Sequence, residues 1–421
     1  MDVERVYDHI HKDELVQLAL EMGNIPSPRG FEKQAGEFVY EWLRKHGFRT
    51  FKQEVVEDRF NVIGLLKGEG KGKSLLFNGH LDTAVGLPED VWFLGVEPED
   101  IHVKAWIEKD EIVGQSVVND KGPLAAFLIA AKAVKESGIK LRGDLLLTAV
   151  VGEIGCCPID EFQGPRYLGS GLGSRRLVEE GYVADYAIVA EATDFAVTWT
   201  EAGDAFFKIT VRGKGGIYTP YIERPFTLEQ NPNAIVKMCK VIMALEEWAY
   251  DYEKRNTYKF SGGTVVPRVN IGAIRGGLPH LPEVTAGICS IYVDVRLAPN
   301  ELPLRVENEI RELLEKIGVN AEIQTYMFRP GYEGKNVEKL VEAIEKVHEK
   351  ECNSKPKKVY TPITSMWRDI NVFNEVGIPA VTYGPGHAIT DPRQLRGESL
   401  KIEDLFKAAR IYASLILELC G

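Results

Sequence analysis

Hydrophobic and polar positions alternate along the first half of the chain in a way that predicts strands separated by helices. Apolar runs at residues 75–80, 145–151 and 186–190 are typical of strands, and uninterrupted apolar character is typical of strands that are buried on both faces. Amphipathic spacing at residues 32–45 and 124–137 predicts helices. This alternation indicates βαβ units and an α/β fold with a parallel or mixed sheet.

Polar residues that suit chemistry stand where the apolar runs end. They are, in chain order, His80, Asn119, Asp120, Glu153 and Glu191. Open α/β sheets bind ligands outside the carboxyl ends of their strands. A single acid at a strand end is usually a cap or a surface group, but several acids after successive strands indicate a shared site. We therefore expect these side chains to gather at one edge of the sheet.

The pattern changes from about residue 204. Strands and helices are predicted in the order β-α-β-β-α, at residues 206–212, 233–252, 269–274, 287–297 and 304–317. This order resembles an α+β ferredoxin-like sandwich. After residue 326 the α/β pattern returns, with a closing helix at residues 402–419. The expected domains are a catalytic domain formed by residues 1–203 and 326–421, and an inserted domain formed by residues 204–325.

Composition and charge narrow the class of protein. The chain has 421 residues, of which 44% are hydrophobic and 27% charged, and its net charge is −11. This charge argues against nucleic-acid partners and anionic membrane surfaces. No signal peptide or apolar run of transmembrane length is visible, and the six cysteines show no framework spacing. We expect a cytoplasmic protein without a nucleic-acid or membrane partner.

His80 and Asp82 form the first candidate site. Neutral imidazole is a good metal ligand, and a carboxylate two residues away can accept the second ring N–H, which fixes the tautomer and the orientation of the ring. The alternative is a histidine at a strand end that a neighbouring acid caps. These two residues alone leave both interpretations open.

The complete set of motifs resembles the M20 metallopeptidase family, which includes acetylornithine deacetylase, succinyl-diaminopimelate desuccinylase, aminoacylase, carboxypeptidase G and carnosinase-like dipeptidases. The motifs occur in the family's order over nearly the whole chain. They are Gly79-His80-Leu81-Asp82-Thr83, Asn119-Asp120-Lys121-Gly122, Gly152-Glu153-Ile154-Gly155, Ala190-Glu191-Ala192-Thr193 and Tyr383-Gly384-Pro385-Gly386. The resemblance implies a mixed-sheet zinc-peptidase-like catalytic domain with an inserted α+β ferredoxin-like domain that serves as a lid and mediates homodimerisation.

The resemblance also implies a two-zinc amidohydrolase. The metal ligands carried over are His80, Glu191 and, at the position of the bridging Asp, Asn119. Glu153 is the implied general base, which accepts a proton from metal-activated water, and Asp82 is the catalytic residue that orients His80. The implied cofactor is one or two zinc ions, with cobalt or manganese as alternatives.

The chain departs from the family at several ligand positions. Asn119 replaces an Asp, Ile154 stands where the second metal needs a carboxylate, and Gln394 occupies the position of a late His. Asp120 and the displaced His387 are candidate replacement ligands. Moving the alignment by one residue would instead make Glu153 the ligand and leave Gly152 at the base position. Residues 213–218 lack the family's substrate-contacting His. Three protein ligands and a water remain sufficient for one catalytic zinc.

Three further residues are candidate substrate contacts. Arg368 could hold a substrate carboxylate with two hydrogen bonds, or form a salt bridge to Asp369 or another acid. Arg296 and His280 lie in the predicted inserted domain, at positions where relatives contact substrate, and structural pairing is the alternative for Arg296.

Two functional hypotheses remain from the sequence. The first is a metal-dependent hydrolase of amide bonds in N-acyl amino acids or short peptides. The second is a catalytically inactive protein of the M20 fold that binds a related small molecule or acts as a scaffold. Retention of His80, Asp82, Glu153 and Glu191 favours the enzyme.

Overall fold

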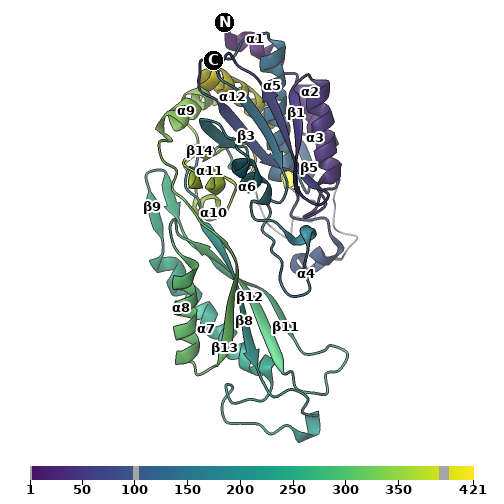
Figure 1. Cartoon of the computed structure of the whole chain (residues 1–421), viewed down its shortest axis with the longest axis vertical. Coiled ribbons are helices and arrows are strands. Elements are labelled where there is room, and N and C mark those ends of the chain that lie inside the picture. Colours follow the sequence, from purple (N-terminus) through teal and green to yellow (C-terminus); the bar gives the residue numbers. More distant parts are fainter. Residues whose placement is uncertain (1, 98–103, 388–397) are drawn as a thin grey trace. The chain divides into compact units, whose positions relative to one another are not determined.

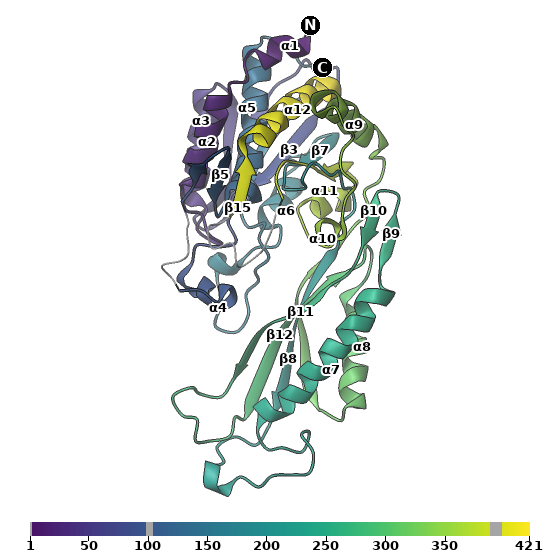
Figure 2. The same cartoon turned by 180° about the vertical axis from the view of Figure 1, so that it is seen from behind.

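A computed structural model describes residues 2–97, 104–387 and 398–421 of the chain (Figures 1 and 2). These residues divide into two compact units. The first comprises Met1–Trp199, Gly334–Val359 and Arg368–Gly421, and the second comprises Thr200–Glu333 and Tyr360–Trp367.

The first unit is built on a six-stranded sheet. Its spatial order is β1 (Arg49–Val56), β2 (Arg59–Leu66), β6 (Leu145–Val150), β3 (Leu75–His80), β7 (Tyr186–Val189) and β14 (Ala380–Thr382). The strands β6, β3, β7 and β14 are parallel, whereas β1 and β2 are antiparallel to their neighbours. Every residue of the central strand β3 is buried. The predicted mixed sheet and its buried strands are confirmed.

Helices cover both faces of this sheet, so the first unit has three layers. The larger core contains side chains from α2 (Lys12–Gly23), α3 (Lys33–Lys45), α5 (Gly122–Glu136), α9 (Glu338–Cys352) and α12 (Ile402–Cys420). The opposite face packs against α6 (Leu172–Glu179) and α11 (Ile370–Glu375). The shorter α-helices are α1 (Asp2–Tyr7) and α4 (Val91–Leu94) in this unit, and α10 (Thr361–Thr364) in the second.

One predicted strand does not join the main sheet. The segment before Asn119 forms β5 (Glu111–Gly114), which pairs antiparallel with β4 (Trp106–Glu108) and β15 (Glu398–Lys401). This small sheet forms because β15, from the far end of the sequence, supplies the partner for β5. Asn119 and Asp120 therefore lie in an irregular turn, Val117–Lys121, that leads into α5 rather than at the end of a main-sheet strand.

The second unit is an α+β sandwich. Its sheet has the order β11 (Val269–Gly276), β12 (Ile288–Leu297), β8 (Gly203–Arg212) and β13 (Ala321–Arg329), with all neighbours antiparallel. Helices α7 (Ala234–Arg255) and α8 (Pro303–Lys316) bury their apolar faces against it. Strand β13 and the hairpin of β9 (Tyr258–Phe260) and β10 (Gly263–Val265) are not predicted by the sequence pattern. Strand β13 continues through the position expected for the second domain boundary, 325/326.

Within the described ranges, no helix combines the length and the apolar character that are needed to cross a membrane.

Candidate metal centre

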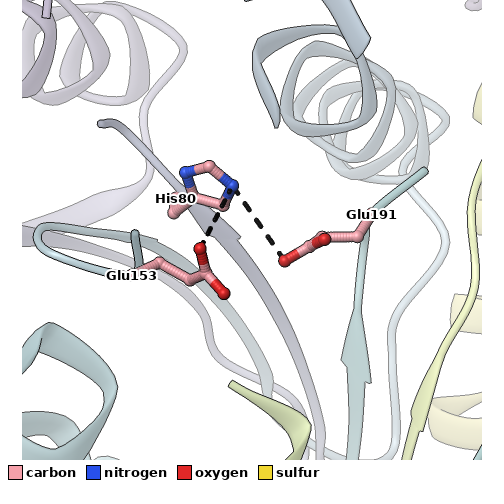
Figure 3. Close-up of side chains that lie close together, drawn as sticks. All are labelled: His80, Glu153 and Glu191. Carbon is pink, nitrogen blue, oxygen red and sulfur yellow. Dashed lines mark ion pairs between the residues drawn. The ribbon is translucent and has the colours of Figure 1, made fainter. Parts of the chain in front are cut away.

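Three side chains from adjacent strand ends meet in the first unit (Figure 3). His80 is the last residue of β3, Glu153 follows β6, and Glu191 follows β7. The strand β3 lies between β6 and β7, and all three run in the same direction. Their carboxyl ends are therefore adjacent, which brings residues distant in sequence into one cluster.

The cluster has the dimensions of a cation site. One ligand atom from each residue lies within 4.8 Å of the other two. The Nε2 atom of His80 is 3.9 Å from Oε2 of Glu153 and 4.0 Å from Oε1 of Glu191. Because zinc–ligand bonds are about 2.0–2.2 Å long, ligand atoms on one ion lie roughly 3–4 Å apart. All three side chains are buried, so a bound cation would be shielded from bulk water.

Asp82 orients the histidine and joins it to the loop that carries Glu153. The Nδ1 atom of His80 is 2.9 Å from the backbone oxygen of Asp82 and 3.5 Å from its Oδ1 atom. When Nδ1 donates its proton there, Nε2 presents its lone pair to the cluster. The Asp82 carboxylate also accepts hydrogen bonds from the backbone N–H groups of Glu153 and Ile154, at 3.1 and 2.8 Å. Asp82 therefore fixes both the ring and the adjacent loop.

Burial dominates the electrostatics of the cluster. It raises the pKa of Glu153 well above its ordinary value, and the charge of Glu191 raises it further. Burial also raises the pKa of Asp120 well above its ordinary range. Burial alone would lower the pKa of His80, but Asp82, Glu153 and Asp120 outweigh this effect and hold it well above 6.5. In the absence of a bound cation Glu153 and Asp120 therefore resist ionisation.

Asn119, and not Asp120, presents a side-chain oxygen to the cluster. Oδ1 of Asn119 is 2.7 Å from Nε2 of His80, whereas Oδ2 of Asp120 accepts a hydrogen bond from the backbone N–H of His80 at 3.0 Å. Glu398 holds the turn in place, because its Oε2 accepts hydrogen bonds from the N–H groups of Val118 and Asn119, both at 2.9 Å. The sequence offered no local signal for this contact of Glu398, which joins distant parts of the chain.

Glu191 has one engaged oxygen and one unsatisfied oxygen. Its Oε2 atom is 2.5 Å from Nε of Arg368. Its Oε1 atom, which faces His80, is buried and has no hydrogen-bond partner among the described residues. A buried carboxylate oxygen without a partner is costly, and a cation at the cluster would remove that cost. The residues present therefore fit a divalent metal ion.

Arg368 forms the salt bridge that the sequence analysis weighed as an alternative, but its partner is Glu191 and not Asp369. Asp369 instead accepts hydrogen bonds from Asn78, at 3.0 Å, and from Ser174, at 2.7 Å. Burial raises the pKa of Asp369 to about 6.

The position before Glu153 leaves no space for a side chain. Gly152 has a φ of +67°, and a Cβ atom there would lie 2.8 Å from Nη2 of Arg59. That arginine is held by a buried pair with Glu32, whose Oε1 atom is 2.5 Å from the same Nη2. Ile154 offers no ligand atom. Glu153 is thus the carboxylate that the loop after β6 brings into the cluster.

The remaining candidate residues lie outside the cluster. His387 is exposed and does not join the three clustered side chains, and Gln394 lies outside the described residues. In the second unit, Arg296 of β12 is 2.9 Å from Asp294 and 3.5 Å from Asp204, which is the structural pairing considered from the sequence. His280 is exposed in the loop between β11 and β12.

Comparisons with known proteins give a consistent family. The sequence model of Peptidase family M20/M25/M40 matches residues 76–418. The chain is 26% identical to N-formyl-4-amino-5-aminomethyl-2-methylpyrimidine deformylase of Bacillus subtilis, over 98% of this chain and 96% of that protein. It is 25% identical to LysW-lysine/LysW-ornithine hydrolase of Saccharolobus solfataricus, over 97% and 96%. Among solved structures, the YXEP protein of Bacillus subtilis, described as a dinuclear metal binding peptidase, matches with a TM-score of 0.61 and 15% identity, over 97% of this chain and 98% of that one.

Proposed function

Because the chain belongs to peptidase family M20/M25/M40, we propose that it is a metal-dependent hydrolase of amide bonds in N-acyl amino acids or short peptides. Membership of this family makes the chain an enzyme of the hydrolase class, which favours the first of the two hypotheses drawn from the sequence. The observation that carries the proposal is the buried cluster of His80, Glu153 and Glu191.

The proposed ligands are Nε2 of His80, Oε1 of Glu191 and the amide oxygen of Asn119. They support binding of zinc, with cobalt or manganese as alternatives, because imidazole and carboxylate groups suit these ions. The neutral amide of Asn119 is a weaker ligand than a carboxylate, so we expect weaker metal binding than an Asp at this position would give. Asp82 orients His80 through the Nδ1 contact.

The cation, when bound, supplies a Lewis acid that polarises a carbonyl group and makes water more acidic. Glu153 is the proposed general base, which accepts a proton from water and passes it to the leaving nitrogen. Its burial raises its pKa, and a carboxylate with a raised pKa holds a transferred proton better at neutral pH. Burial of the whole cluster keeps this proton out of exchange with bulk water.

The relatives' names support the reaction class of this proposal. One removes a formyl group from an amine and another hydrolyses a conjugate of lysine or ornithine. Both names describe hydrolytic release of a nitrogen compound. We therefore propose a small N-acyl compound or short peptide as the partner of the site.

We further propose a homodimer formed through the second unit. Strand β11 is an outer strand of its sheet, and the neighbouring Ile274, Leu278 and Ile288 expose 53%, 54% and 51% of their surface. An outer strand with exposed apolar side chains favours pairing with another chain. Sedimentation equilibrium tests this proposal: wild type should be a dimer and Ile274→Glu a monomer, whereas a monomeric wild type would contradict it.

The proposed function is tested by metal content and by turnover. Protein purified with zinc or manganese should retain metal by elemental analysis and hydrolyse members of a panel of N-formyl, N-acetyl and dipeptide substrates. Glu153→Gln should lower kcat by about 100- to 10,000-fold while bound metal stays largely intact. Glu403→Gln, at an exposed acid of α12 that pairs with Lys12, is the matched control and should retain activity. Unchanged turnover in Glu153→Gln would show that the base is misassigned.

A further inference from the structure

Among the described residues, Arg368 is the only arginine or lysine that forms a salt bridge with a carboxylate of the cluster of His80, Glu153 and Glu191. It is 3% exposed, and its Nε atom lies 2.5 Å from Oε2 of Glu191. Its Nη2 atom also donates to the backbone oxygen of Ala192, at 3.4 Å. A guanidinium is permanently charged at any pH at which the protein folds. Glu191 therefore has a permanent cation at Oε2, its outer oxygen, while Oε1, its inner oxygen, faces His80.

The other clustered groups leave few ligands for a second metal ion. A carboxylate bridges two ions by giving one oxygen to each, but the amide of Asn119 has a single acceptor oxygen, and its nitrogen carries only donor hydrogens. Ile154 has no ligand atom at all. The outer oxygen of Glu191 is already engaged by Arg368.

We propose that the site holds one divalent cation per chain and that Arg368 supplies the second positive charge of the site. This proposal rests on the proposed function and deepens it. The guanidinium neutralises the outer oxygen of Glu191, which leaves Oε1 as a single-oxygen ligand directed at His80. It also repels any further cation from the neighbourhood of Glu191. The chain thus differs from the YXEP protein, which is described as binding two metals.

The number of bound ions in the wild type is the first test. Metal-free protein is titrated with Mn²⁺ alone and with Zn²⁺ alone, and the bound metal is counted by equilibrium dialysis and elemental analysis. We expect saturation at one ion per chain, and an electron paramagnetic resonance spectrum of the Mn²⁺-loaded protein with the six lines of an isolated ion. Two ions per chain, or a spin-coupled pair, would overturn the proposal and leave the proposed function standing. No bound ion would overturn both.

The charge of Arg368 is the second test, and the direction of the change decides it. Arg368→Met removes the repulsion between the guanidinium and the ion and releases the second oxygen of Glu191. We therefore expect Mn²⁺ to bind at least about tenfold more tightly at pH 8. Weaker or unchanged binding would overturn the charge role and show that Arg368 acts by orienting Glu191.

Two further variants keep this test independent of folding. Arg368→Lys preserves the positive charge but lacks the planar guanidinium with its Nε donor. We expect the Mn²⁺ affinity of this variant to stay within about threefold of the wild type. If Arg368→Lys instead binds Mn²⁺ as tightly as is expected for Arg368→Met, the proposal is overturned. The matched control is Arg212→Met in the second unit, where Nε lies 2.7 Å from Oε1 of Glu322 in an exposed pair. It should leave the affinity for Mn²⁺ unchanged. If Arg368→Met does not fold, the Arg368→Lys affinity and the wild-type stoichiometry still decide.

Discussion

In each unit an arginine contacts a buried carboxylate, yet the two arrangements differ in the group that lies beside the neighbouring acid. In the second unit, Arg296 lies 2.9 Å from Asp294 and 3.5 Å from Asp204. In the first unit, Arg368 contacts Glu191, while Oε2 of Glu153 lies 3.9 Å from Nε2 of His80. Among the described contacts, the neighbouring acid pairs with the same arginine in the second unit and with His80 in the first.

This difference separates a structural ion-pair network from the proposed metal site. Burial raises the pKa of Asp204 well above its ordinary range, and the charge of Arg296 opposes the rise. Burial raises the pKa of Glu153 in the same direction, but the opposing charge there is that of His80, a group that binds metal when it is neutral. An acid whose charge is compensated by an arginine of the chain itself has a structural role. Acids left without such a partner favour an external cation.

Removing the metal should have the largest effect, and its consequences should be confined to the first unit. Prolonged dialysis against a chelator should lower turnover by at least about 100-fold, because Lewis-acid activation contributes several kcal/mol. Added Zn²⁺ or Mn²⁺ should restore it. Far-UV circular dichroism should stay unchanged, since the strands that carry the cluster are buried in a continuous core. Full turnover by protein shown to be metal-free would contradict the proposed function.

Breaking the ion pairs of the second unit should affect stability without affecting metal binding. Arg296→Met removes the guanidinium that lies 3.5 Å from Asp204, which is 2% exposed. Removing one partner of a fully buried pair costs about 3–5 kcal/mol. Arg296 is partly exposed and Arg329 also offsets the charge of Asp204, so we expect a smaller fall in the urea midpoint while metal content stays at the wild-type level. Loss of bound metal in this variant would show that the ion pairs of the second unit and the metal site of the first unit are coupled.

A smaller effect is expected from Asp369, through pH. Its pKa is raised to about 6 by burial, from an ordinary value of 3.8. The unfolded chain therefore loses this proton near pH 4 and the folded chain near pH 6, so stability falls as pH rises through that window. In metal-free protein, the unfolding free energy of the wild type relative to Asp369→Asn should fall by on the order of 2 kcal/mol between pH 4 and pH 6.

The control for this measurement is an acid with the opposite shift. Lys73 lowers the pKa of Asp185, so the unfolding free energy of the wild type relative to Asp185→Asn should rise, not fall, as the pH increases through the acid range. If the difference in unfolding free energy between the wild type and Asp369→Asn does not change with pH, Asp369 ionises normally in the folded protein.

The sequence by itself determined the architecture and the residues most worth examining. Apolar runs specify buried strands because side-chain burial depends on a residue's own chemistry and on its near neighbours in the chain. The order of the motifs then specified the family. It also indicated that His80, Glu153 and Glu191 lie at neighbouring strand ends, because parallel strands share one carboxyl edge.

The tertiary structure alone decided which atoms face one another. Asn119 and Asp120 are adjacent in sequence, and only the turn held by Glu398 directs the amide to His80 and the carboxylate to a backbone N–H. The partner of Arg368 likewise lies far away in the chain and not next to it. Such pairings depend on contacts between distant segments, which local periodicity does not encode. The same reason explains why β5 joined β15 instead of the main sheet.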